Sequence, residues 1–295
     1  MADHLRIERL PSLRRPVLVA AFRGWNDGAQ GASLAAGYLA QQFAARKFGD
    51  IDPEEFYDFQ ATRPMVALAE GMTRRIDWPE NALYHAELPG TGRDVVLLLG
   101  IEPNLRWRTF CSTVASLAGE LGVELVVTLG ALLADVPHTR PAPVTGSASD
   151  PSLVRELGLT FSRYEGPTGI VGVLHDACGT AGLASASLWA AVPHYASLAS
   201  SPRAALALCS RLGALLGATF ELDELEQASE AYERQVSEAV AQDEETEAYV
   251  HELERRRDAL GESLDLPSGD TLAAELTRFL REHEARRREE GDDGV

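Results

Sequence analysis

The chain has 295 residues, enough for one large α/β domain with an appendage or for two modest domains. Its net charge of −18, without any basic stripe, argues against nucleic-acid binding, because an acidic surface repels phosphate backbones. No apolar run approaches the ~20 residues of a membrane span, and the first residues show no signal-peptide pattern, so we expect a cytoplasmic protein that is not membrane-bound.

The three cysteines, Cys111, Cys178 and Cys209, lie in apolar settings and form no C-x-x-C pair. This usage suits a reducing compartment and predicts neither disulfides nor a structural zinc site. We expect no metal and no cofactor. The acidity is concentrated near the end of the chain, since residues 221–295 contain 24 acidic side chains and 9 arginines.

A buried strand that turns into a helix is the first predicted unit. The apolar run 16–21 is typical of an interior strand, and apolar residues at helical spacing follow over 29–46. Between them lie four polar or aromatic side chains: Arg23, Trp25, Asn26 and Asp27. Ligands and partners of open α/β sheets bind at the carboxyl ends of strands, so this turn is a candidate site. Helix capping by Asn26 or Asp27, with one packing aromatic, is the alternative explanation.

Strands and helices then alternate. Alternating or continuous apolar residues predict strands, and helical spacing predicts helices, one of them closed by Gly122. The predicted strands are 56–59, 75–78, 82–87, 95–99, 125–129, 169–173 and 184–190, and the helices are 105–121, a short one from 151, and 202–216. This repetition predicts a mostly parallel sheet that is covered by helices on both faces.

The last quarter of the chain is predicted to be helical. Residues 223–260 contain no proline and form a narrow apolar stripe, including Leu225, Tyr232 and Val236. So thin a stripe needs a covering surface, and we expect a second subunit to provide it, with the chain's own core as the alternative. A last helix is predicted over 272–280, and residues 286–295 are expected to be disordered.

Tests for enzymatic motifs are negative. The sequence has no G-x-S-x-G elbow and no Walker loop, and Gly24, Gly28 and Gly31 do not follow the dinucleotide-binding spacing. His175 and Cys178 fall at the end of a predicted strand, where neighbouring side chains point to different sides, which is a poor geometry for a nucleophile and its base.

Three loop residues remain as candidates. His138 and His194 each follow a proline in a loop, without a metal-binding spacing such as H-x-x-x-H. Arg63 is expected to pair with Asp58, or with the residues of the first turn.

Five motifs occur in an order that resembles the bacterial branch of the proteasome assembly chaperone 2 family. They are Gly-Trp-Asn-Asp-Gly-Ala at 24–29, Glu-Phe-Tyr-Asp-Phe-Gln-Ala-Thr-Arg-Pro at 55–64, Ala-Asp-Val-Pro-His-Thr-Arg-Pro at 134–141, Val-Thr-Gly at 144–146 and Ser-Leu-Trp-Ala-Ala-Val-Pro-His-Tyr at 187–195. The resemblance implies a three-layer α/β/α fold similar to nucleoside phosphorylases and hydrolases, with a C-terminal helical extension. Relatives that dock on proteasomes often use a C-terminal hydrophobic–tyrosine–any tail, which the sequence Gly-Asp-Asp-Gly-Val at 291–295 lacks.

Two functional hypotheses follow. The first is a non-enzymatic assembly chaperone that self-associates and binds protein partners, with proteasome subunits as the candidates that the resemblance implies. The alternative is a nucleoside-like small-molecule binder or hydrolase with a pocket at the sheet edge. We favour the first, because no nucleophile–base pair or phosphate cradle is found. The predicted division is an α/β core over 1–220, an acidic helical arm over 221–285 and the tail. The candidate binding cluster is Arg23, Trp25, Asn26, Asp27, Arg63, His138, Arg140 and His194.

Overall fold

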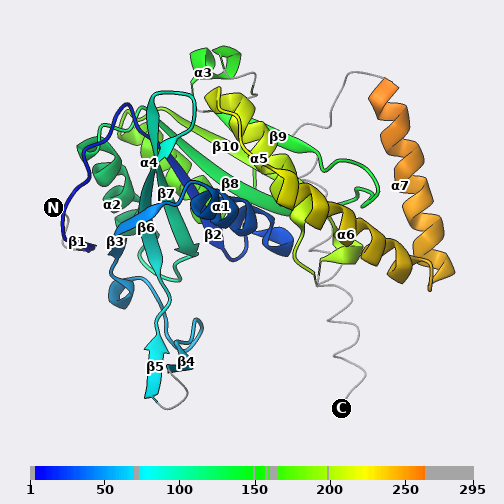
Figure 1. The fold of residues 1–295 in the computed structure, drawn as a ribbon, viewed down its shortest axis with the longest axis horizontal. Helices are drawn as coiled ribbons and strands as arrows, with labels where there is room; N and C mark the ends of the chain where they lie inside the picture. The colour runs from blue at the N-terminus through cyan, green and yellow to red at the C-terminus, as the bar shows by residue number, and fades with distance from the viewer. Residues whose placement is uncertain are drawn as a thin grey trace.

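The computed structural model describes residues 4–69, 73–148, 150–156, 159, 165–197 and 199–262. An eight-stranded sheet forms the centre of the molecule, in the strand order β1-β3-β6-β7-β2-β8-β10-β9 (Figure 1). The predicted last helix and the predicted disordered tail lie outside the described residues.

Four neighbouring strands form the parallel centre of this sheet. They are β7 (Arg93–Ile101), β2 (Val17–Arg23), β8 (Leu125–Ala134) and β10 (Ser185–Pro193). Nearly every side chain of β2 and β8 is buried, as expected for parallel strands that are covered on both faces.

The outer strands are antiparallel. On one side lie β6 (Asn81–Leu88), β3 (Arg46–Ile51) and β1 (Leu5–Ile7), and on the other side β9 (Val144–Ala148) pairs with β10. The α/β class is confirmed, but the sheet is mixed, whereas the sequence predicts a mostly parallel one. Antiparallel neighbours can be joined by a short loop, whereas parallel neighbours need a crossover connection, usually a helix. The flanking strands therefore lack the strand–helix alternation by which the parallel centre is predicted.

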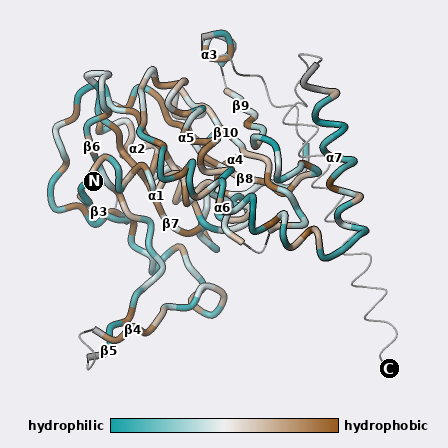
Figure 2. Tube along the Cα trace, turned by 45° about the vertical axis from the view of Figure 1, so that its right-hand side comes forward, coloured by the Kyte–Doolittle hydropathy of each residue, from teal (hydrophilic) through white to brown (hydrophobic). Residues whose placement is uncertain are grey.

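Helices cover both faces of the sheet and complete the three layers. On one face, α1 (Gly31–Gln42) and α5 (Pro202–Leu216) pack on the odd-numbered side chains of β2. On the other face, α2 (Trp107–Glu120) and α4 (Ile170–Thr180) pack on the even-numbered ones. The hydrophobic residues of the core follow these layers (Figure 2). A short helix, α3 (Pro151–Glu156), follows β9, as predicted.

The predicted strand 169–173 is wrong, because this segment begins helix α4. Its buried residues, Ile170, Val171, Leu174 and Cys178, have the spacing of one helix face and pack against the sheet. A short apolar run cannot be assigned to a strand or a helix by periodicity alone, which explains the error.

The predictions for residues 56–59 and for the end of the first helix also differ from the structure. Residues 56–59 form no strand, because a 3-10 turn (Pro53–Glu55) leads into them and the Phe56 ring is buried against Phe110. Helix α1 ends at Gln42 rather than at residue 46, and Ala44 has a positive φ of 47° where the chain turns into β3.

The predicted strand 75–78 is one half of a separate hairpin, β4 (Met65–Ala69) and β5 (Thr73–Asp77), which extends away from the body of the molecule (Figure 1).

The predicted long helix after residue 223 is two helices, α6 (Asp223–Val240) and α7 (Glu244–Glu262). Asp243 separates them, since its carboxylate accepts hydrogen bonds from the Glu245 N–H and the Thr246 hydroxyl at the start of α7. We call α6 and α7 together the arm. No described helix has the length and apolar character that a membrane crossing requires.

Candidate functional site at the carboxyl edge of the sheet

The loops that carry the candidate residues leave the same edge of the sheet. Strands β2, β8 and β10 are parallel, and Asp27 bridges to Ala131 of β8, while Ala134 and Pro193 are paired at the ends of β8 and β10. The segments after residues 23, 134 and 193 therefore begin side by side. Within this edge, the side chains divide into two groups with different partners.

Glu102, which follows β7, is the centre of the first group. Its Oε2 accepts the Trp25 N–H at 3.1 Å, and its Oε1 accepts the Asn26 side-chain amide at 2.9 Å and the Ile170 N–H at 2.8 Å. One carboxylate thus joins the turn after β2, the turn after β7 and the first residue of α4. Sequence reasoning missed this residue, and the available signal was an acidic side chain directly after a buried strand.

Two glycines permit this close approach. Gly24 has a φ of +147°, and a Cβ there would lie 2.8 Å from the Glu102 Cβ. A Cβ on Gly169 would lie 2.1 Å from the Asn26 side-chain nitrogen. Gly24, Asn26 and Gly169 therefore let the turn after β2 lie directly against Glu102 and the start of α4.

Asp27 caps helix α1, as the alternative explanation of this turn supposed. Its Oδ1 accepts the Ala32 N–H at 2.8 Å and the Ser33 N–H at 3.2 Å, in the first turn of the helix. Burial raises the pKa of the Asp27 carboxyl, although the bonds from Ser33 and Ala32 oppose that change. Arg23 and Trp25, in contrast, are exposed.

Replacing Asp27 tests whether this turn is structural. We expect Asp27→Ala to lower the free energy of unfolding by about 1–2 kcal/mol, the usual cost of a lost N-cap. Asp27→Asn keeps the accepting oxygen and should cost less than half as much. Chemical denaturation of the three proteins measures both values. Equal stability of Asp27→Ala and the parent chain would refute the capping role.

His138 is the centre of the second group and lies between the core and the arm. The residue is 1% exposed; its backbone N–H donates to the Tyr195 hydroxyl at 2.8 Å, and its Nδ1 lies 2.9 Å from the same oxygen. Its Nε2 lies 2.9 Å from the Ser237 hydroxyl on α6. Burial lowers the pKa of His138, so the imidazole is neutral near pH 7.

Arg140 and His194 continue this contact along the arm. Arg140 forms a two-pronged ion pair with Asp258 of α7, with both nitrogen–oxygen distances at 2.8 Å. The pair raises the pKa of Arg140 and lowers that of Asp258. The His194 Nδ1 lies 3.3 Å from the Asp135 Oδ1. The His194 ring meets the Tyr249 ring edge to face, with 5.6 Å between the ring centres.

The arm's apolar stripe is covered by the chain's own core. Tyr232, Val236, Val240 and Val250 form a buried cluster to which Tyr195 and Ala196 of the core contribute. Arg203 of α5 also pairs with Glu233 of α6. The chain's own core, which was the alternative, therefore covers this part of the stripe, where a second subunit was expected.

Arg63 belongs to neither group. It is exposed just before β4, and the structure records no ion pair from it to Asp58 or Asp27, both of which are described. Asp58 instead accepts the Gln60 N–H at 2.8 Å.

His175 and Cys178 lie one turn apart on helix α4, whereas the sequence predicts that they lie at the end of a strand. The His175 Nδ1 lies 3.0 Å from the Ser185 hydroxyl, and burial raises the pKa of the Cys178 thiol to about 11. Cys178 is therefore protonated near neutral pH, which makes it a poor nucleophile.

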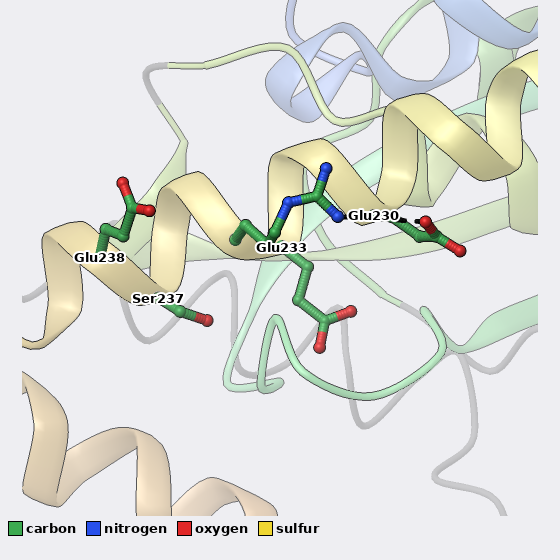
Figure 3. A pocket seen from close by; sticks show the side chains of 5 residues that line it. Glu230, Glu233, Ser237 and Glu238 are labelled. Carbon is green, nitrogen blue, oxygen red and sulfur yellow. Dashed lines mark ion pairs between the residues drawn. The ribbon is translucent and has the colours of Figure 1, made fainter.

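A hollow of about 460 Å³ lies on α6 beside the second group (Figure 3). It is lined by Glu230, Glu233, Arg234, Ser237 and Glu238. Its acidic lining favours cationic groups of a partner. Among the described residues, no group of three or more His, Cys, Asp or Glu side chains is arranged to hold a metal ion.

Comparison with known proteins identifies relatives of this fold. A sequence profile described as the PAC2 family matches residues 21–240. A PAC2 family protein from Streptomyces avermitilis is 48% identical, covers 80% of this chain and 99% of its own, and superposes with a TM-score of 0.75. No curated protein matches.

Two structures from Mycobacterium tuberculosis are also similar. A proteasome-assembly chaperone homologue is 46% identical, with 79% of this chain and 99% of that chain covered and a TM-score of 0.73. A protein of unknown function is 27% identical, with 94% and 97% covered and a TM-score of 0.82.

Proposed function

The chain belongs to the PAC2 family, and on that premise we propose that it is a non-enzymatic assembly chaperone that binds proteasome subunits in the cytoplasm. The observation that carries the proposal is its 46% identity to a proteasome-assembly chaperone homologue over 99% of that chain. We further propose that the chain forms homo-oligomers, and that it divides into a core over 1–220 and an acidic region over 221–285, whose helices α6 and α7 pack on the core.

The use of the polar residues at the carboxyl edge supports a binding role over catalysis. Asp27 caps α1, Asn26 is bound to Glu102, and His138 and Arg140 hold the arm. A catalytic acid or base has to reach a substrate, whereas Asn26, Asp27 and His138 are buried, and each has at least one side-chain atom bonded to the protein itself. The nucleoside-like alternative thus has no distinct group of residues in its favour.

Capture from a native extract tests this proposal. The full-length chain, tagged and immobilised, is expected to retain proteasome α subunits, and purified α subunits should bind it directly. An unrelated protein of similar net charge controls for non-specific retention of basic proteins. Absence of subunits from the retained fraction, together with turnover of a nucleoside substrate, would contradict the chaperone role and support the alternative.

A further inference from the structure

The exposed large hydrophobic side chains of the described residues gather in two adjoining places. Five lie on or beside the β4–β5 hairpin: Met65, Val66, Leu68, Ile76 and Trp78, with exposed fractions of 68, 62, 67, 53 and 51%. The other two, Trp25 and Leu105, follow the adjacent strands β2 and β7, and each is 47% exposed. Clustered exposed apolar side chains mark interaction surfaces.

The base of the hairpin is tied to the same edge of the sheet as Trp25 and Leu105. The Leu105 N–H donates to the Phe56 carbonyl at 3.0 Å, and the side chain of Asn104 accepts from the Asp58 N–H and the Thr62 hydroxyl. The Phe59 and Trp78 rings meet edge to face at 4.8 Å. The hairpin therefore extends from a fixed base.

The hairpin has one mainly aliphatic face and one mixed face. Val66 pairs with Ile76, and Leu68 pairs with Arg74, so these four side chains share a face. The ion pair between Arg75 and Asp77, at 2.7 Å, lies on the opposite face, which also carries the exposed Met65. The first face exposes three aliphatic side chains and one cation.

A hairpin of this kind needs a partner. In the described structure, β4 and β5 pair only with each other. An isolated two-stranded hairpin is marginally stable in water, and covering its apolar face stabilises it. The apolar face of β4 and β5 is thus the part of this surface that gains most from a contact.

Charge indicates what that partner is. Arg63 and Arg74 are exposed and form no ion pair with any described residue. The arm is the acidic part of the chain, with 15 acidic side chains and 4 arginines over residues 221–262. On α6, Glu230 and Glu238 are exposed at the hollow, and Glu230 lies 4.0 Å from Arg234 in a loose, exposed ion pair.

Within one copy of the chain, α6 does not cover the hairpin, since Val66, Leu68 and Ile76 remain exposed. The hairpin extends at the lower left of Figure 1, and α6 runs from the centre toward the right of the same view. Contact between them consequently requires two copies of the chain.

We propose that the β4–β5 hairpin of one copy docks on the acidic surface of α6, around Glu230 and Glu238, in a second copy. This rests on the self-association proposed above and gives it a contact surface. The contact joins two different surfaces, so repeating it generates a closed ring or an open chain of subunits.

Charge reversal in the full-length chain tests this contact. A hairpin variant carries Arg63→Glu and Arg74→Glu, and an arm variant carries Glu230→Arg and Glu238→Arg. Each variant alone should self-associate at least about tenfold more weakly than the parent chain in sedimentation velocity, because like charges then face each other. An equimolar mixture should regain association, since each variant offers the surface that complements the other. Glu244→Arg with Glu245→Arg, at the start of α7, is the matched control and should behave like the parent.

Three results would overturn the proposal. They are a monomeric parent chain at every concentration tested, parent-like association of the arm variant alone, and a mixture that stays monomeric. If the arm variant still self-associates while the hairpin variant does not, the contact joins two hairpins instead. Binding of proteasome α subunits by each variant, measured separately, tells failure of this contact apart from failure of the chaperone role.

Discussion

Replacing Glu102 with alanine is expected to lower the free energy of unfolding by roughly 2–3 kcal/mol. The carboxylate accepts the Trp25 N–H, the Asn26 amide and the Ile170 N–H, and its loss leaves these donors without their partner. The Asn26 amide and the Ile170 N–H lie in partly buried sites, where an unsatisfied donor costs about 1–3 kcal/mol, whereas the exposed Trp25 N–H can bond to water instead. The effect should exceed that of Asp27→Ala.

Denaturant unfolding of Glu102→Ala beside Glu120→Ala provides the measurement. Glu120 is an exposed residue at the end of α2, and its replacement should change stability by less than about 0.5 kcal/mol. Hydrogen exchange should also show faster exchange at the start of α4 in Glu102→Ala alone. Similar stabilities for the two variants would mean that Glu102 does not join the three segments.

Replacing His138 with alanine is expected to release the arm from the core. The substitution removes both ring nitrogens, one bonded to Tyr195 and the other to Ser237, and leaves a cavity in a buried site. The combined cost is roughly 3 kcal/mol. Hydrogen exchange over residues 223–262 should accelerate more than exchange in β2 and β8.

Because of His138, the stability of the folded chain is expected to decrease as the pH falls. Burial lowers the pKa of His138, opposed by Glu233 and Glu254 and assisted by Arg203, while Tyr195 and Ser237 contact its ring. As the pH falls through about 6.5, the unfolded chain therefore binds a proton that the folded chain resists, and stability decreases. Burial also lowers the pKa of His175, with the same sign.

The parent chain should accordingly lose stability between about pH 7 and pH 5, above the range in which carboxylates titrate. His138→Ala should lose less stability over this interval, so the difference in the free energy of unfolding between the two proteins is smaller at pH 5 than at pH 7. His251→Ala, on an exposed part of α7, is the control and should keep the parent's pH profile. If the parent chain and His138→Ala differ in the free energy of unfolding by the same amount at pH 7 and at pH 5, His138 is not the source of the pH dependence.

The central part of the fold is predictable because single elements carry strong local signals. The fully buried strand β2 reads as a continuous apolar run, and helix α5 has a proline near its start and a glycine at its end. The five ordered motifs identified the family, which the comparisons confirm.

The rest depends on contacts that no local pattern contains. Helix α4 begins where the Glu102 carboxylate binds the Ile170 N–H, and these residues are 68 positions apart. The arm packs on its own core through His138 and Ser237, which are 99 positions apart. Glu102 was missed for the same reason, since a lone glutamate after a strand resembles an ordinary surface residue.

Assembly of proteasome particles in the presence of this chain tests the central claim most directly. Purified α and β subunits from the same organism are mixed with and without the full-length chain, and the particles formed are followed by native electrophoresis and sedimentation. The proposed chaperone role predicts that the chain binds α subunits and increases the rate or yield of assembled particles. Unchanged assembly, with no α subunit bound to the chain, would contradict it.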